Sequence, residues 1–263
     1  MRAAMLAIAA VLVIAGLSGC LARFDGEGGP ENRAPRAVLT ADKQSSWSGE
    51  SIEFDARQSN DRDGEIERWQ FDFGDGTRED VTRKEDARLT HTFVRGGQYT
   101  VTVTVFDSGD AQGGALTDTA SVSVSVNEEI PVAQAVLYAS PPGSDNESPT
   151  AKYNQSFEVR ENADRIEVHL DVQNAFALGS SELTFRLLDP NGQRLDEKSV
   201  TVNEEEDQSV ELNGPARTTG TYAVEVEAQS GGAGIEGEIR VYYDQPGGAR
   251  GSGDDQDDDV PPQ

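Results

Sequence analysis

The stretch Trp69-Gln70-Phe71-Asp72-Phe73-Gly74-Asp75-Gly76-Thr77 decides the fold of this chain. Its aromatic residues alternate with polar residues, and this period of two is typical of a strand with one buried face. The following Gly-Asp-Gly ends the strand, because glycine tolerates the positive φ of a tight turn and aspartate can accept hydrogen bonds from the nearby backbone. The stretch therefore predicts a β-strand followed by a tight turn.

Strand patterns continue on both sides of this stretch. Residues 51–55 place Ile52 and Phe54 on one face, and residues 99–105 alternate Tyr or Val with Thr. Further strands are predicted at residues 37–41 and 120–126, and the interval 78–90 is interpreted as a charged connection. Many short strands separated by turn signals favour a β-sandwich.

Four segments together resemble a known family. They are Phe54-Asp55-Ala56-Arg57-Gln58-Ser59-Asn60-Asp61-Arg62-Asp63-Gly64, the stretch from Trp69 to Thr77, His91-Thr92-Phe93, and Gly96-Gly97-Gln98-Tyr99 with the Thr/Val run to Asp107. In this order and at this spacing, residues 34–127 resemble the PKD (polycystic kidney disease) domain. The resemblance implies an immunoglobulin-like β-sandwich that contacts proteins or glycans outside the cell. It does not imply catalysis.

The conspicuous side chains of this domain have structural interpretations beside functional ones. Trp69 is either a core residue or a platform for stacking a sugar, and its place in an alternating strand favours the core. Asp72 and Asp75 are either caps of turn amides or a paired acid and base, and their position favours caps. The family resemblance implies a structural, hydrogen-bonding histidine at His91.

A second all-β domain is predicted for residues 131–244, after a short hinge at residues 128–131. Alternating patterns recur at residues 155–160, 165–172, 183–187, 199–202, 209–212, 222–228 and 238–243, and no helical period is visible. Asp189-Pro190-Asn191-Gly192 is a strong turn signal. The domain looks faintly similar to the jelly-roll domains appended to secreted peptidases, so we expect a jelly-roll-like β-sandwich.

His169 lies between Glu167 and Asp171 on the polar face of a predicted strand. These three side chains are either a metal cluster or simply a polar face. Neighbours at i±2 on a solvent-facing strand favour the polar face.

The N-terminus is interpreted as a secretion signal. Residues 3–17 are apolar, a length that is short for a transmembrane helix but suits a signal-peptide core. The run ends in Leu17-Ser18-Gly19-Cys20, which resembles the lipobox of secreted lipoproteins. The resemblance implies that residues 1–19 are removed and that Cys20, the only cysteine, carries a lipid. Residues 20–33 are then a flexible tether. A plain cleaved signal or an uncleaved anchor is the alternative.

The charge is strongly acidic. The chain has 48 Asp and Glu against 22 Lys and Arg, which gives a net charge of −26. Acid spread along every strand with only four lysines favours an extreme halophile, here a halophilic archaeon, because mutual repulsion is screened in concentrated salt. An ordinary acidic protein is the alternative. Nucleic acid is excluded as a partner, since binding phosphates requires clustered Lys and Arg. Residues 245–263 form a Gly- and Asp-rich tail that we expect to be disordered.

Calcium is the one cofactor to which the family resemblance points. Some PKD domains bind it through an Asp-x-Asp-Gly loop, an Asn at the start of the domain and an Asp after the Val-rich strand. In this chain the corresponding residues are Asp61, Asp63, Asn32 and Asp107. Carboxylates suit calcium, which takes oxygen ligands. The alternative is an Asp-rich turn in which these side chains cap backbone amides.

Two sequons, at Asn146 and Asn154, are candidate sites of N-glycosylation on an exported chain. No catalytic residue is assigned, because the chain has two histidines and neither a Gly-x-Ser-x-Gly elbow nor spaced metal ligands.

The favoured hypothesis is a non-catalytic, lipid-anchored protein of the cell surface that contacts an extracellular protein or glycan. The alternatives are a secreted hydrolase or its accessory subunit, such as a carboxylate-based glycosidase or a peptidase-associated protein, and a substrate-capturing transport lipoprotein.

Overall fold

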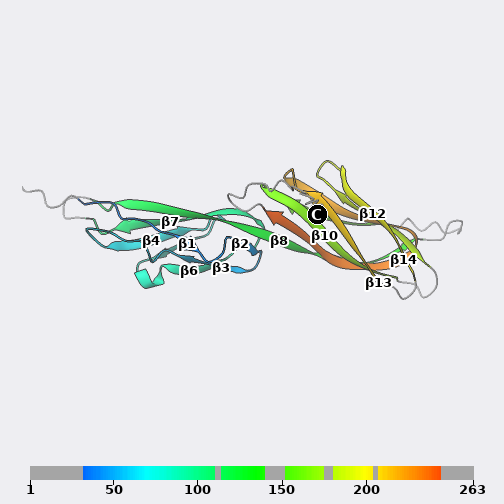
Figure 1. The fold of residues 1–263 in the computed structure, drawn as a ribbon, viewed down its shortest axis with the longest axis horizontal. Helices are drawn as coiled ribbons and strands as arrows, with labels where there is room; N and C mark the ends of the chain where they lie inside the picture. The colour runs from blue at the N-terminus through cyan, green and yellow to red at the C-terminus, as the bar shows by residue number, and fades with distance from the viewer. Residues whose placement is uncertain (1–31, 110–113, 140–151, 175–179, 204–206, 244–263) are drawn as a thin grey trace, which may run out of the picture. The chain divides into compact units, whose positions relative to one another are not determined.

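The computed structural model describes residues 32–109, 114–139, 152–174, 180–203 and 207–243 (Figure 1). This part of the chain is built almost wholly of β-strands, and its helical content is the single 3-10 turn η1 (Lys84–Asp86). It contains no helix of the length and hydropathy needed to cross a membrane. The predicted all-β class is confirmed.

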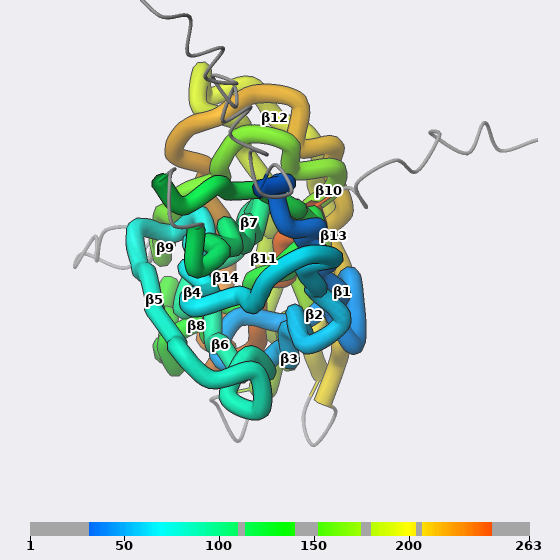
Figure 2. Tube along the Cα trace, turned by 90° about the vertical axis from the view of Figure 1, so that its left-hand side faces the viewer, coloured from blue at the N-terminus to red at the C-terminus, as the bar shows by residue number. Residues whose placement is uncertain are grey.

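The first sandwich is formed by the strands between residues 40 and 127, whose colours run from blue to green in Figures 1 and 2. One sheet has the order β1 (Thr40–Ala41), β3 (Ser51–Asp55), β6 (Arg88–Thr92). The other has the order β5 (Arg78–Val81), β4 (Ile66–Asp72), β7 (Gly97–Asp107), the first part of β8 (Thr117–Ala139) and β2 (Ser45–Trp47). Among the strands of the described residues, β2 alone pairs in parallel, with β8.

Alternation along the strands produces the core of this sandwich. Ile52 and Phe54 of one sheet are fully buried, as is Phe71 of the other, and the rings of Phe54 and Phe73 lie 5.7 Å apart. Each such side chain contributes about 1.5–3 kcal/mol on burial. Trp69 is 2% exposed within this cluster, so it is a core residue.

The predicted charged connection at residues 78–90 is wrong, because β5, η1 and much of β6 lie in it. Charged side chains hide the strand period there: most residues of β5 are exposed, and Val81 alone packs against the core.

Within the residues that the structure describes, the second sandwich has eight strand segments in two four-stranded antiparallel sheets. In chain order they are the second half of β8, β9 (Lys152–Val159), β10 (Ala163–Asn174), β11 (Ser181–Leu188), β12 (Arg194–Val202), β13 (Asp207–Pro215) and the two halves of β14 (Gly220–Tyr243). One sheet has the order first, eighth, third, sixth, and the other second, seventh, fourth, fifth. This is the strand order of a jelly roll, so the jelly-roll expectation is confirmed.

Strand β14 belongs to both sheets of the jelly roll. It pairs with β9 up to Glu227 and with β11 up to Ser230, then with β8 from Gly231 and with β10 from Ala233 onward. The change occurs at Gly231, whose φ is +71° and where a Cβ would lie 2.5 Å from the Ser181 hydroxyl oxygen. The patterns at residues 222–228 and 238–243 are therefore two parts of one strand.

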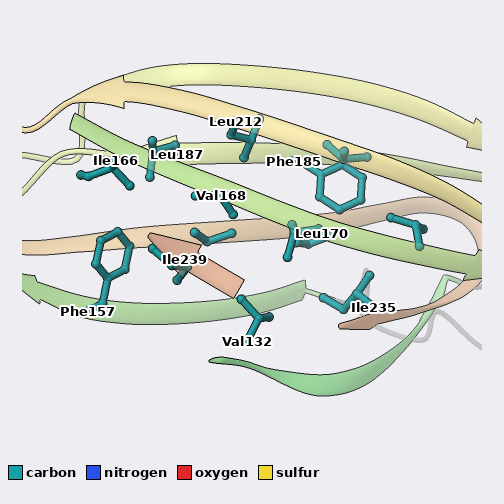
Figure 3. Close-up of a cluster of buried hydrophobic side chains, with 14 of the residues drawn as sticks. Val132, Phe157, Ile166, Val168, Leu170, Phe185, Leu187, Leu212, Ile235 and Ile239 are labelled. Atoms are coloured by element: carbon teal, nitrogen blue, oxygen red, sulfur yellow. The ribbon is translucent and has the colours of Figure 1, made fainter. Parts of the chain in front are cut away.

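A separate core fills the jelly roll. Ile166, Val168 and Leu170 of β10 face Phe185 and Leu187 of β11, and all five are at most 1% exposed. Figure 3 shows these side chains between the two sheets.

The predicted hinge at residues 128–131 is instead a continuous part of β8, paired with residues 238–241 of β14. Asn127 Oδ1 accepts a hydrogen bond of 3.1 Å from the Tyr243 backbone N–H. Proline is tolerated because this half of β8 is an edge strand. The Pro131 carbonyl points away from β14 and accepts a hydrogen bond from the Gln155 side chain. Since the N and C=O of one strand residue point to the same side, the N–H that proline lacks would also have pointed away from β14.

Candidate functional site

The four predicted calcium ligands gather at one end of the first sandwich. Strand β7 ends at Asp107, which is 1% exposed. Its Oδ1 accepts the backbone N–H groups of Gly109 and Leu116, at 2.9 and 2.8 Å, and its Oδ2 accepts from Asn32 Nδ2 at 3.0 Å. Asp107 therefore ties the connection after β7 to the start of the domain.

The Asp-rich loop meets this carboxylate from the other side. Asp61 Oδ1 accepts the N–H of Asp63 at 3.2 Å, which is the bond of an Asx turn, and Asp63 Oδ2 accepts the N–H of Arg33 at 3.0 Å. The Ser108 N–H donates to the Glu65 carbonyl at 3.0 Å and joins the loop to the end of β7. The structure thus brings the loop, β7 and the domain start together.

The donor set fits calcium in its chemistry. Three carboxylates and one amide offer only oxygen ligands to a hard cation, and Asp61 Oδ2 is buried without a hydrogen-bond partner among the described residues. The other carboxylates are engaged with backbone amides, and the described part of the chain holds no group of three or more His, Cys, Asp or Glu side chains arranged around one point. Calcium at Asn32, Asp61, Asp63 and Asp107 stays a prediction.

The turn after β4 uses Asp72 and Asp75 as caps. Asp72 Oδ1 accepts the Gly74 N–H at 3.0 Å, and Asp75 Oδ1 accepts the Thr77 N–H at 2.9 Å. The Gly74 N–H and then Arg78 lower the pKa of Asp72. Burial raises the pKa of Asp75, but hydrogen bonds from Thr77 and His91 outweigh it, so the net shift is downward. Both carboxylates thus serve the turn.

His91 holds this turn against the core. Its Nε2 lies 2.7 Å from Asp75 Oδ2, and its ring stacks on Phe73 with the centroids 4.0 Å apart. This is the hydrogen-bonding environment that the resemblance implied.

On the jelly roll, His169 points outward from β10. Its Nε2 is 3.8 Å from Glu167 Oε2, and its Nδ1 is 3.7 Å from Glu211 Oε1. Asp171 accepts from Ser209 Oγ at 2.8 Å. The three predicted residues therefore belong to a polar outer face that also includes β13.

Register decides a network that sequence reasoning missed. Arg186 Nε lies 2.7 Å from Glu197 Oε2, and Arg186 Nη1 lies 2.9 Å from Glu227 Oε2. The pKa of each glutamate is lowered, and the hydrogen bond from Arg186 is the largest cause. Nothing in the local sequence shows that these residues are neighbours on adjacent strands.

The remaining predicted sites are on or outside the described chain. Asn154 lies on β9, is exposed, and donates from Nδ2 to Glu225 Oε1 at 3.2 Å. Cys20 and Asn146 lie outside the described residues.

Residues 32–124 match the model of the PKD domain family. The chain therefore contains a PKD domain, followed by a jelly roll, and is a PKD domain-containing β-sandwich protein.

Two curated enzymes are similar to part of the chain. It is 37% identical over 116 residues to collagenase ColA of Clostridium perfringens, which covers 44% of this chain and 9% of that enzyme. It is 36% identical over 103 residues to a microbial collagenase of Vibrio alginolyticus, which covers 38% of this chain and 12% of that enzyme. The chain thus spans about a tenth of the length of these relatives.

Similar solved structures include the PKD domain of the human VPS10 domain-containing receptor SorCS2, with 20% identity, coverage of 43% of this chain and 95% of that one, and a TM-score of 0.27. Another comes from a study of carbohydrate-binding modules of the β-sandwich superfamily, with 17% identity, coverage of 79% and 97%, and a TM-score of 0.32. Scores of this size carry no argument about function.

Proposed function

We propose that this protein is a non-catalytic surface lipoprotein that presents its two sandwiches to an extracellular protein or glycan. The observation that carries the proposal is the PKD domain at residues 32–124, joined through the continuous strand β8 to a jelly roll with its own core. The conspicuous carboxylates of the PKD domain act as caps of turns, which supports a binding role over acid–base chemistry.

Anchoring rests on Cys20. With its lipid attached, the mature protein would start at this residue, on the outer face of the cytoplasmic membrane, and residues 20–33 would tether the PKD domain. One acyl chain binds a membrane only marginally and two bind it stably, so a diether-type lipid would suffice. The acidic composition supports the proposal that the protein functions in concentrated salt, as in a halophilic archaeon.

A second candidate function is an accessory subunit of a secreted protease. The similarity to two collagenases favours it, because the matched segments are a small part of each enzyme. In this role the chain would hold a protein substrate for a separate catalytic chain.

Membrane fractionation tests the anchor. A Cys20→Ser variant should leave the membrane fraction and lose lipid label, while a Ser18→Ala variant should remain. A Cys20→Ser protein that stays in the membrane with unchanged mass would contradict lipid anchoring.

Capture from surface extracts tests the binding role. Immobilised full-length protein should retain a discrete protein or glycoconjugate that heat-denatured protein does not retain. Turnover of protein or glycan substrates by the purified chain alone would instead favour a hydrolase.

A further inference from the structure

The outer face of the jelly-roll sheet β8–β14–β10–β13 carries an apolar pair at its edge. On β8, Val132 and Leu137 point into the core, whereas Val136 and Tyr138 point outward and are each 52% exposed. They are two of the four large hydrophobic side chains exposed in the described part of the chain, and the other two are on the first sandwich. Paired exposed apolar residues on one face indicate a contact surface more than scattered ones do.

Two glycines of β14 lie opposite this pair. Val136 is opposite Gly234 and Tyr138 is opposite Gly232 on β14. A Cβ on Gly234 would meet nothing within 4 Å, so packing does not require glycine there. The effect of the glycine is to leave the sheet open beside Val136.

An acidic pocket lies on the same outer face, two residues along β14 from Gly234. Its lining includes Gln134, His169, Asp171, Glu236 and Glu238. Asp171 and Glu236 are opposite each other on β10 and β14. Within the described residues neither forms an ion pair with Lys or Arg, whereas Glu238 is paired with Arg240. The pocket therefore offers two carboxylates to an incoming cation.

We propose that this face binds an extended segment of a partner protein in which an arginine or lysine is followed, two residues later, by an apolar side chain. The inference rests on the proposed binding function and assigns its partner class. Charge complementarity places the cation between Asp171 and Glu236, where a guanidinium can form charge-assisted hydrogen bonds. The apolar side chain covers Val136 in the open space above Gly234.

The spacing of the face sets the spacing of the ligand. Glu236 lies opposite Asp171 and Gly234 lies opposite Val136, and these two β14 residues are two positions apart along the strand. Two residues of a strand span about 6.8 Å, and side chains at i and i+2 of an extended peptide share one face. An Arg-x-apolar segment lying along the strands thus matches both rows, and a further apolar residue at i+4 reaches toward Tyr138.

Fluorescence anisotropy tests the proposal with full-length, detergent-solubilised protein. The probe is a dye-labelled peptide, Ser-Arg-Ser-Leu-Ser-Leu-Gly, compared with the same peptide carrying citrulline for arginine and with one in which Arg and Leu are adjacent. The first peptide should bind at least tenfold more tightly than either control, because only it combines the charge with the two-residue spacing.

Variants test whether the peptide binds to the outer face of the sheet β8–β14–β10–β13. Asp171→Asn/Glu236→Gln should weaken binding of the arginine peptide at least tenfold. Glu182→Gln/Glu225→Gln, which removes two charges from strands of the other sheet, should leave it unchanged. Gly234→Val should fold normally, because a Cβ at this position meets nothing within 4 Å, and should lose binding by filling the space beside Val136.

Equal binding of the arginine and citrulline peptides, or wild-type binding by Asp171→Asn/Glu236→Gln, would overturn the proposal. Surface-extract capture separates this failure from that of the proposed function. Capture that persists in Asp171→Asn/Glu236→Gln leaves the binding role intact and moves it to another face. Capture that this variant loses without any preference for arginine points to a glycan.

Discussion

The turn after β4 in the first sandwich is held by aspartates that act on their sequence neighbours, whereas the course of β14 in the jelly roll depends on glycines that lie close to distant strands. Asp72 accepts from Gly74, and Asp75 accepts from Thr77, each two residues away. In the jelly roll, a Cβ on Gly237 would lie 2.0 Å from the carbonyl oxygen of His169. The contrast explains why the first sandwich has a recognisable sequence signature and the second has mainly an alternating pattern.

Of the substitutions that test this contrast, Gly237→Ala should lower the stability of the protein most. The added methyl would collide with β10 backbone, so we expect the jelly roll to lose about 3 kcal/mol or more of unfolding free energy. Urea titration followed by circular dichroism measures it. Gly234→Ala is the matched control, because its Cβ meets open space and should change stability by less than about 0.5 kcal/mol. Equal midpoints for the two variants would contradict close backbone approach at Gly237.

Calcium should stabilise the first sandwich and leave the jelly roll unchanged. At 100 times its Kd, a ligand that binds only the folded state adds about 2.7 kcal/mol. Calorimetric titration of calcium chloride into the full chain at high salt should give binding heat, and Asp61→Asn should reduce it, since Asp61 Oδ2 is the unpartnered oxygen. Asp196→Asn on the jelly roll should retain the heat. A wild-type protein without binding heat would leave the aspartates as turn caps alone.

Acid should weaken the turn after β4 through Asp75. The pKa of this carboxyl is lowered in the folded protein, so its contribution to stability is present above its unfolded pKa of about 3.9 and is lost as pH falls through the lower, folded value. Asp75→Asn should cost about 1–2 kcal/mol at neutral pH and flatten the loss of stability below about pH 4. The measurement is the urea midpoint of the first sandwich at several pH values.

Glu67→Gln serves as the control, because this exposed side chain lies on the same sandwich outside the turn. An acid slope in Asp75→Asn that matches the wild type would show that Asp75 does not carry this part of the pH dependence.

Local chemistry allowed much of the first sandwich to be predicted. The alternation through Phe71 and the turn at residues 74–76 depend on strand period and on glycine and aspartate within a few residues, and the structure confirms both. The family resemblance implied that Asn32 and Asp107 lie together, and the structure places them in hydrogen-bond contact. The prediction of a hinge at residues 128–131 is wrong. A proline beside acidic residues is typical of a linker, and the sequence does not show that this segment is an edge strand, where proline is tolerated.

Sequence alone determined the all-β class, the inward faces of the long strands and the residues that cap turns, because these depend on side chains a few positions apart. Only the tertiary structure decided that β14 is one strand shared by two sheets, that Arg186 lies between Glu197 and Glu227, and that Glu236 faces Asp171. These features depend on strand register, and register is set by packing between segments that are far apart in the chain.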